Sequence, residues 1–220
     1  MPRLVLASAS PARLSVLHTA GVKPVVRVSG VDEDAVVASL DPGSTPAQIV
    51  TELARAKATE VVPELRDEGL QDALVIGCDS MLLIDGQLQG KPGTVDQARA
   101  RWRAMAGNSA ELLTGHCVVR VRDNKVIGQA CDHSATTVFF GTPTDEELES
   151  YLESGEPLEV AGAFTLDGLG GWFIDRIEGD PSSVIGIGLP LVRRLLAEVG
   201  VSVAQLWAEN AAIPLESLEN

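Results

Sequence analysis

Segments with strand-like and helix-like patterns alternate along this chain, and that alternation limits the fold more than any other feature. Arg3 to Ala7 has the pattern of a strand, and Ser10-Pro11 then opens a helix with Ser at the N-cap and Pro at the first helical position. Thr45-Pro46 opens a longer helix to about Val61, and Thr144-x-x-Glu147 is a capping box for another. Since strands and helices take turns, the sequence predicts an α/β fold.

The remaining segments fit the same organisation. Ala73 to Cys78 is apolar enough for a strand buried on both faces. Leu112 to Arg122 and Val126 to Phe140 are predicted to pair as strands around a turn at Asp123-Asn124. Leu189 to Val199 is predicted as the last long helix. We therefore expect one two-lobed domain over residues 1–200, followed by a C-terminal tail over 201–220 that has a short amphipathic helical segment and an acidic end.

The charge balance excludes one class of function. Acidic residues outnumber Lys and Arg by 31 to 17, which gives a formal net charge of −14. Such a surface repels polyanions, so we expect no nucleic-acid polymer as a partner, although a local basic pocket can still bind a small anion. The uninterrupted apolar runs are far too short to span a membrane. The protein is accordingly expected in the cytoplasm.

Cysteine and histidine usage gives no sign of a disulfide framework or of a metal site built on these residues. The three cysteines form no C-x-x-C pair and are odd in number, and the three histidines are scattered. We therefore expect neither a disulfide framework nor a zinc site.

The first candidate site is the turn between the first strand and the first helix. Ser8, Ser10 and Arg13 lie at this helix N-terminus, where free N–H groups, hydroxyls and a guanidinium together suit a phosphate. The simpler alternative is an ordinary N-cap followed by a surface arginine.

Lys57 is the second candidate because it falls on the apolar side of its helix. It lies four residues after Leu53 and four before Val61. A lysine in that position either extends its ammonium along the apolar surface to water or points it into a polar cleft.

Further charged residues follow the strands. Asp79 comes after the buried strand, where ligands bind in α/β proteins, although it could simply cap a loop. Cys78 is poorly placed as a nucleophile because no histidine lies near it in the sequence. Lys91 projects from the turn Gly90-Lys91-Pro92. Asp32-Glu33-Asp34 reads either as a solvated helix start or as donors for a divalent cation.

Together these groups fit phosphoryl-transfer or phosphoanhydride chemistry, in which positioning and charge neutralisation supply most of the catalysis. The sequence contains no G-x-x-x-x-G-K-[ST] phosphate loop.

The order of these motifs resembles the Maf family of nucleoside triphosphate pyrophosphatases, and most closely its actinobacterial members. The similarity extends over roughly residues 3–196, and its specificity lies in the combination of stretches that include LASASPARLSVL (6–17), VDED (31–34), LARAKA (53–58), VIGCDSMLLIDGQLQGKP (75–92) and GEPLEVAGAFTLDGLGGWF (155–173). The resemblance implies a two-lobed mixed-sheet fold of the Maf and ITPase type with a central cleft.

The resemblance also implies an activity and a set of roles. The activity is hydrolysis of a nucleoside triphosphate between the α and β phosphates, with Mg²⁺ or Mn²⁺ as the required divalent cation. Its implied cellular role is house-cleaning of the nucleotide pool. Asp79 matches the catalytic acid/base and a metal ligand, and Glu33 matches an acidic position near the metal. The positions that match the substrate-binding residues are Ser8, Ser10, Arg13, Lys57 and Lys91. Because cationic neighbours favour ionisation, we expect a low pKa for Asp79.

Three positions linked to substrate choice depart from the family pattern. Ala12 replaces an arginine, Ser80 stands where Thr or Gln is usual, and Asp167 stands where members carry Gln or Glu. The chain thus matches neither well-defined subgroup. Because an ionised Asp167 offers only acceptors, we expect a preference for base edges rich in N–H donors, such as guanine or cytosine, over uracil or thymine.

Two alternatives to this function remain open. One is a nucleotide-binding regulator of septum formation and cell division that does not need catalysis, and the other is a different nucleotide-metabolising hydrolase. A homodimer is plausible in each case.

Overall fold

The computed structural model describes residues 2–66 and 69–211 and has the mixed α/β fold that the sequence predicts. In these residues the strands form a seven-stranded sheet in the order β2-β1-β3-β5-β6-β7, with β4 paired to β3. The β2-β1-β3 part is parallel, whereas β4 pairs with β3 and β7 with β6 in antiparallel fashion. The strands are β1 (Arg3–Leu6), β2 (Val25–Val26), β3 (Asp72–Ile84), β4 (Gln87–Gln89), β5 (Ser109–Arg122), β6 (Lys125–Phe140) and β7 (Ile174–Glu178).

The helices begin where the sequence provides capping side chains. Ser10, Thr45 and Thr144 each accept a hydrogen bond from a backbone N–H of the first turn, and the last two form complete capping boxes. The α-helices are α1 (Pro11–Thr19), α2 (Glu33–Ser39), α3 (Pro46–Glu60), α4 (Val95–Met105), α5 (Asp145–Glu153), α6 (Pro181–Ile185), α7 (Leu189–Glu198) and α8 (Val203–Asn210). The 3₁₀ helices are η1 (Pro63–Arg66), η2 (Glu156–Glu159), η3 (Ala161–Ala163) and η4 (Leu169–Phe173).

The chain divides into two compact units that alternate in sequence. The first unit runs from the N-terminus to Asp79 and also takes in Gly115–His133 and the chain from Leu189 onward. The second unit consists of Ser80–Thr114 and Ser134–Gly188.

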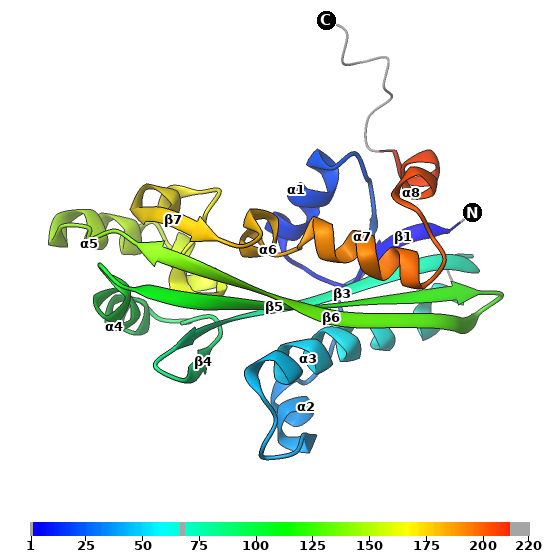
Figure 1. Ribbon diagram of the computed structural model, residues 1–220, viewed down its shortest axis with the longest axis horizontal. Helices are drawn as coiled ribbons and strands as arrows, with labels where there is room; N and C mark the ends of the chain where they lie inside the picture. The colour runs from blue at the N-terminus through cyan, green and yellow to red at the C-terminus, as the bar shows by residue number, and fades with distance from the viewer. Residues whose placement is uncertain (1, 67–68, 212–220) are drawn as a thin grey trace, which may run out of the picture. The chain divides into compact units, whose positions relative to one another are not determined.

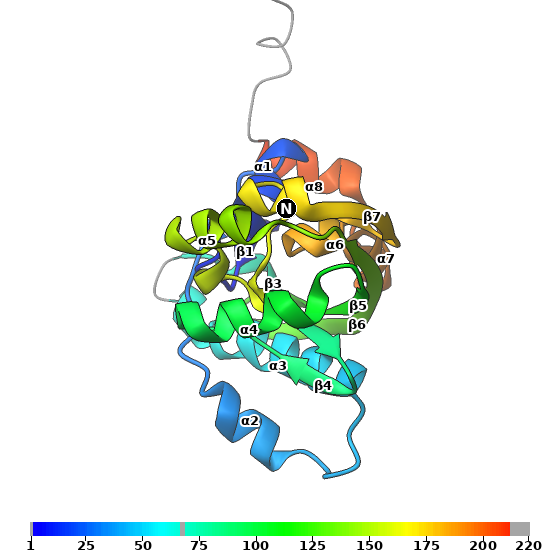
Figure 2. The same ribbon diagram turned by 90° about the vertical axis from the view of Figure 1, so that its left-hand side faces the viewer.

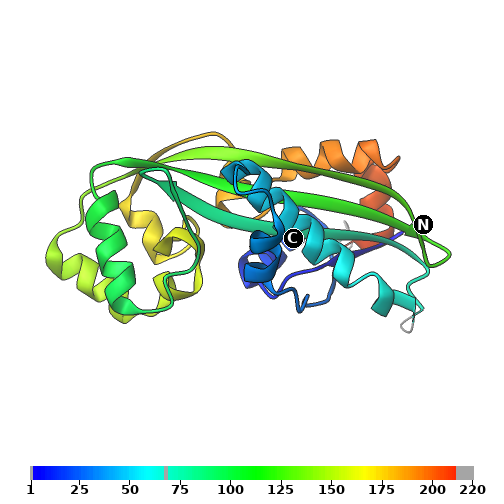
Figure 3. The ribbon, with the colours of Figure 1, turned by 90° about the horizontal axis from the view of Figure 1, so that it is seen from below.

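In the first unit helices cover both faces of the sheet. Helix α3 lies on one face, and α1 and α7 lie on the other (Figure 1). The view from below shows α3 lying across the strands (Figure 3), and two glycines allow its close approach to them. A Cβ at Gly77 would be 2.2 Å from the Ala54 carbonyl oxygen, and one at Gly115 would be 2.0 Å from the Val50 carbonyl oxygen. Helix α3 is thereby fixed against β3 and β5.

The second unit is built around an aromatic cluster. Trp102 of α4 is fully buried and meets the rings of Phe140, Tyr151 and Phe173 edge-on, with centroids 5.7–5.8 Å apart. Its indole N–H donates a 2.7 Å hydrogen bond to the Ala163 carbonyl. Helices α4 and α5, which carry two of these rings, are visible in Figure 2.

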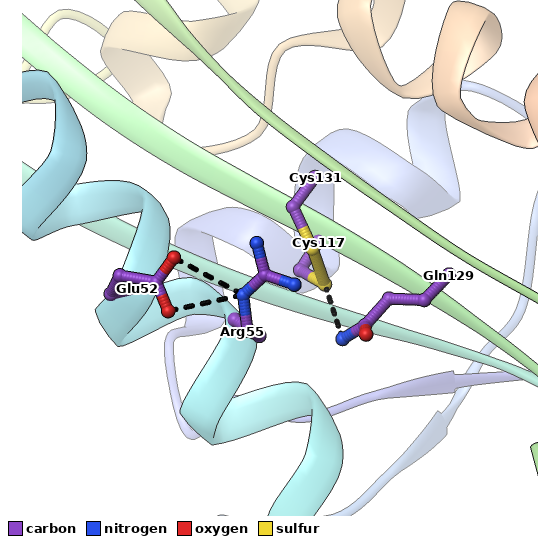
Figure 4. Close-up of a disulfide and its surroundings, with 5 residues drawn as sticks. All are labelled: Glu52, Arg55, Cys117, Gln129 and Cys131. Carbon is purple, nitrogen blue, oxygen red and sulfur yellow. Dashed lines mark hydrogen bonds and ion pairs between the residues drawn. A yellow bond between two sulfur atoms is a disulfide. The ribbon is translucent and has the colours of Figure 1, made fainter.

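The β5–β6 hairpin contains a disulfide that the cysteine count did not predict. Cys117 and Cys131 are bonded across the two strands, and the Gln129 side-chain amide donates to the Cys117 sulfur (Figure 4). The expectation was wrong in this respect because it weighed cysteine number and local spacing. The hairpin instead brings together residues 14 apart in sequence. Cys78 is the free cysteine and is buried.

The C-terminal segment contains a helix attached to the first strand. Asn210, at the end of α8, accepts from the Leu4 N–H at 2.8 Å and donates to the Pro2 carbonyl at 3.2 Å. The acidic end predicted after it, residues 212–220, lies outside the described residues. Within residues 2–66 and 69–211, no helix is both long and apolar enough to cross a bilayer.

Candidate active site

The turn after β1 holds three of the predicted residues in one hydrogen-bonded arrangement. The Ser8 hydroxyl oxygen accepts from the Ser10 N–H at 3.2 Å and from the Arg13 guanidinium at 3.1 Å. Ser10 is the N-cap of α1, as predicted, and its hydroxyl accepts from the Arg13 N–H. Since Ser8 already accepts two bonds, its own O–H proton remains to be donated to a ligand.

Arg13 ties this turn to the neighbouring strand. Its guanidinium donates a 2.9 Å bond to the Cys78 carbonyl, the residue before Asp79. This contact follows from the parallel register, in which Leu6 of β1 lies beside Ile76 of β3. β1 ends at Leu6, whereas β3 continues past Ile76, so the turn after β1 lies beside Cys78 and Asp79 of β3. Arg13 is therefore an integral part of the turn, and the interpretation as a mere surface arginine is wrong.

Lys57 of α3 is directed at two carboxylates. Its ammonium nitrogen lies 2.6 Å from Asp79 Oδ1 and 2.7 Å from Glu33 Oε1. The Lys57 side chain is only 13% exposed. The alternative in which Lys57 extends along an apolar surface into water is therefore wrong.

Glu33 lies in the first turn of α2, whose N-cap is Asp32. The acidic run is a helix start, as one interpretation predicted, and it also supplies a carboxylate to Lys57.

Asp79 lies inside β3 and is not a loop cap, because the strand continues through it to Ile84. The residue is 5% exposed, and its second oxygen, Oδ2, is buried without a hydrogen-bond partner in the described residues. Burial raises the pKa of Asp79 above its ordinary value, and this outweighs the lowering effect of Lys57 and Arg13. The expectation of a low pKa was therefore wrong. It considered the cations and omitted the loss of solvent.

Cys78 is poorly suited to act as a nucleophile in this environment. Its side chain is fully buried, and burial raises the pKa of the thiol to about 11, while the charges of Arg13 and Lys57 act in the opposite direction. A thiol of this kind is a poor nucleophile at neutral pH.

The other predicted residues are distributed over both units. Ala12 lies half-buried in α1, just after the turn that holds Ser8 and Ser10. Ser80 begins the second unit, and its hydroxyl lies 3.1 Å from that of Thr114. Lys91 is exposed after β4, 3.6 Å from Glu159, and Asp167 is exposed between η3 and η4. The first unit thus brings together Ser8, Ser10, Arg13, Glu33, Lys57 and Asp79, while Ser80, Lys91 and Asp167 belong to the second unit.

Sequence reasoning missed the residues that bring Lys57 to Asp79. A Cβ at Gly77 would lie within 3 Å of three atoms of α3, so this glycine sets how closely the helix approaches the strand that carries Asp79. The signal was present, because a glycine inside an otherwise apolar strand often marks a close backbone approach.

The residues around Asp79 fit a hard divalent cation. Oδ2 of Asp79 is an unpaired buried oxygen, and Glu33 supplies a second carboxylate to the same lysine nitrogen. Within the described ranges, no three His, Cys, Asp or Glu side chains are clustered as a complete metal site.

Comparison with known proteins decides the family. A family model described as "Maf-like protein" matches residues 3–199. This chain belongs to the Maf family. It is similar to the nucleoside triphosphate pyrophosphatase of Rhodococcus jostii (strain RHA1), with 70% identity over 97% of the chain and all of the relative. It is also similar to proteins of that name from Nocardia farcinica (68% identity, 94% of the chain, 98% of the relative) and Mycobacterium marinum (59%, 96% and 99%). The family and the actinobacterial grouping that the sequence indicated are thereby confirmed.

Proposed function

We propose that this Maf protein hydrolyses nucleoside triphosphates between the α and β phosphates, releasing a nucleoside monophosphate and pyrophosphate. The observation that carries the proposal is the buried carboxylate of Asp79, with one oxygen bound to Lys57 and the other unpaired. Relatives up to 70% identical, named nucleoside triphosphate pyrophosphatase, support the same reaction.

The first unit supplies the groups that this reaction needs. The Ser8 hydroxyl, the N-terminus of α1 and Arg13 are donors for a phosphate. Lys57 holds Asp79 in place through Oδ1, while Oδ2 has no hydrogen-bond partner in the described residues. A carboxylate whose pKa is raised accepts a proton better than an ordinary one, so Asp79 is suited to orient and deprotonate the attacking water.

A divalent cation, Mg²⁺ or Mn²⁺, would be held by Asp79 and Glu33 and would neutralise charge on the triphosphate. Lys91 is proposed as a further phosphate-binding cation of the second unit. Ala12, Ser80 and Asp167 are proposed to set the nucleobase preference.

The cellular setting of the reaction is part of the proposal. We place the protein in the cytoplasm, acting on unwanted or modified nucleotides as a homodimer, without a nucleic-acid polymer or membrane as partner.

The products distinguish this proposal from its alternatives. The purified protein is incubated with a panel of natural and modified triphosphates and Mg²⁺, Mn²⁺ or chelator, and the products are separated by anion-exchange chromatography. We expect equal amounts of pyrophosphate and monophosphate with either metal and none with chelator. Release of orthophosphate and a nucleoside diphosphate would indicate a different hydrolase. Binding without any product would indicate the nucleotide-binding regulator.

A further inference from the structure

A loop of the second unit, Thr165–Gly170, is held by the carboxylate of Glu156. Oε1 of Glu156 accepts from the Thr165 hydroxyl at 2.5 Å and from the Gly170 N–H at 3.1 Å. Oε2 accepts from the Leu169 N–H at 3.1 Å. One half-buried side chain thus binds three donors that are 9 to 14 residues further along the chain.

The ionised carboxylate is the only form of this side chain that satisfies all three donors. Burial acts to raise the pKa of Glu156, but the bonds from Thr165, Leu169 and Gly170 outweigh it and lower the pKa. A glutamine of the same shape has one oxygen and one NH₂ group. Either orientation of that amide turns N–H bonds toward at least one of the donors and loses its hydrogen bond.

The loop that Glu156 holds carries Asp167. Asp167 lies between Thr165 and Leu169, both of which are bound to Glu156, and its own side chain is exposed. A fixed backbone on both sides limits the positions that the Asp167 carboxylate can reach. If the loop were not held, the entropy cost of ordering it on binding would weaken the affinity of the protein for the nucleotide.

We propose that Glu156 is a positioning residue that fixes Asp167 for recognition of N–H groups on the nucleobase edge. This inference rests on the proposed function, in which Asp167 sets the nucleobase preference. Glu156 does not itself contact the nucleotide in this proposal. Its effect reaches the ligand only through the Thr165–Gly170 loop. Substitutions of Glu156 and Asp167 should therefore have non-additive effects on nucleotide binding.

The test measures binding, so that it does not depend on turnover. The dissociation constants of the α,β-methylene analogues of GTP and UTP are measured by titration calorimetry with Mg²⁺. The proteins compared are the wild type, Glu156→Gln, Asp167→Ala and the double variant. Glu153→Gln is the matched control, because it removes an exposed carboxylate at the last residue of α5, three residues before Glu156. Hydrogen exchange of the segment 164–171 reports whether the loop is held.

We expect the wild type to bind the GTP analogue more tightly than the UTP analogue. Glu156→Gln should lower that preference by about fivefold or more and abolish protection of the Leu169 and Gly170 amides, whereas Glu153→Gln changes neither. In the Asp167→Ala background, Glu156→Gln should change the preference by less than about twofold. If Glu156→Gln does not fold, Thr165→Val removes one donor of the same network and is measured in its place.

Three results would overturn the inference: equal wild-type affinity for the two analogues, a preference that Glu156→Gln leaves unchanged, or equal effects of Glu156→Gln with and without Asp167. Failure of the proposed function gives a different result, because the wild type would then release no pyrophosphate from GTP whatever the analogues show.

Discussion

At the scale of single residues, the site depends on the balance between burial and charge at Asp79. Removal from solvent favours the neutral carboxyl, while Lys57 at 2.6 Å favours the ionised form. Burial has the larger effect, so the carboxyl retains a raised affinity for protons. Lys57 contacts both Asp79 and Glu33, and we propose that it serves the chemistry by holding these two carboxylates.

The contribution of Lys57 is tested by Lys57→Met, which keeps an unbranched apolar side chain and removes the ammonium group. We expect kcat/KM to fall by about tenfold or more, because Asp79 and Glu33 lose their shared partner. Arg55→Met is the control, since Arg55 lies on the same helix, is 43% exposed and pairs with Glu52. Steady-state kinetics with both variants decides the matter. Equal activity of Lys57→Met and Arg55→Met would show that turnover does not depend on Lys57.

Cys78 is predicted to resist alkylation in the folded protein. With a pKa of about 11, roughly one thiol in a thousand is ionised at pH 8, and burial blocks access to it. Mass spectrometry after iodoacetamide treatment should show no labelling of Cys78 at pH 8 until denaturant is added. Rapid labelling under native conditions would show that this thiol is ionised or exposed.

At the scale of elements, the site is held by the close approach of α3 to β3 and β5. Gly77 and Gly115 have no room for a side chain, since a Cβ on either would overlap a backbone oxygen of α3. Lys57 is on this helix, so the distance between helix and sheet determines whether its ammonium reaches Asp79.

The two glycines are tested by Gly77→Ala and Gly115→Ala. Each should lower the free energy of unfolding by about 3 kcal/mol or prevent folding, because the methyl group overlaps main-chain atoms that cannot rotate away. Gly128→Ala in β6 is the control, because its Cβ would meet only ordinary contacts of 3.6 Å or more. Urea unfolding followed by circular dichroism measures all three. A loss below about 0.5 kcal/mol at Gly77 would contradict the close packing of α3.

At the scale of the whole molecule, local signals were predictable from the sequence and long-range contacts were not. The helix starts at Ser10, Thr45 and Thr144 follow from side chains within three residues of each cap. The Cys117–Cys131 bond and the Glu156 contacts join positions 9 to 14 residues apart, so no local sequence pattern predicts them. The resemblance selected Asp79 as the catalytic residue, but only its burial showed that its pKa is raised.

The measurement that tests the central claim most directly is turnover by Asp79→Asn. Asn keeps the shape of the side chain and removes its charge and basicity. Pyrophosphate release is measured with the best triphosphate under saturating Mg²⁺, and thermal unfolding confirms that the variant is folded. We predict that kcat falls by about 100-fold or more while the melting curve stays cooperative. A folded Asp79→Asn protein that releases pyrophosphate at the wild-type rate would contradict the account.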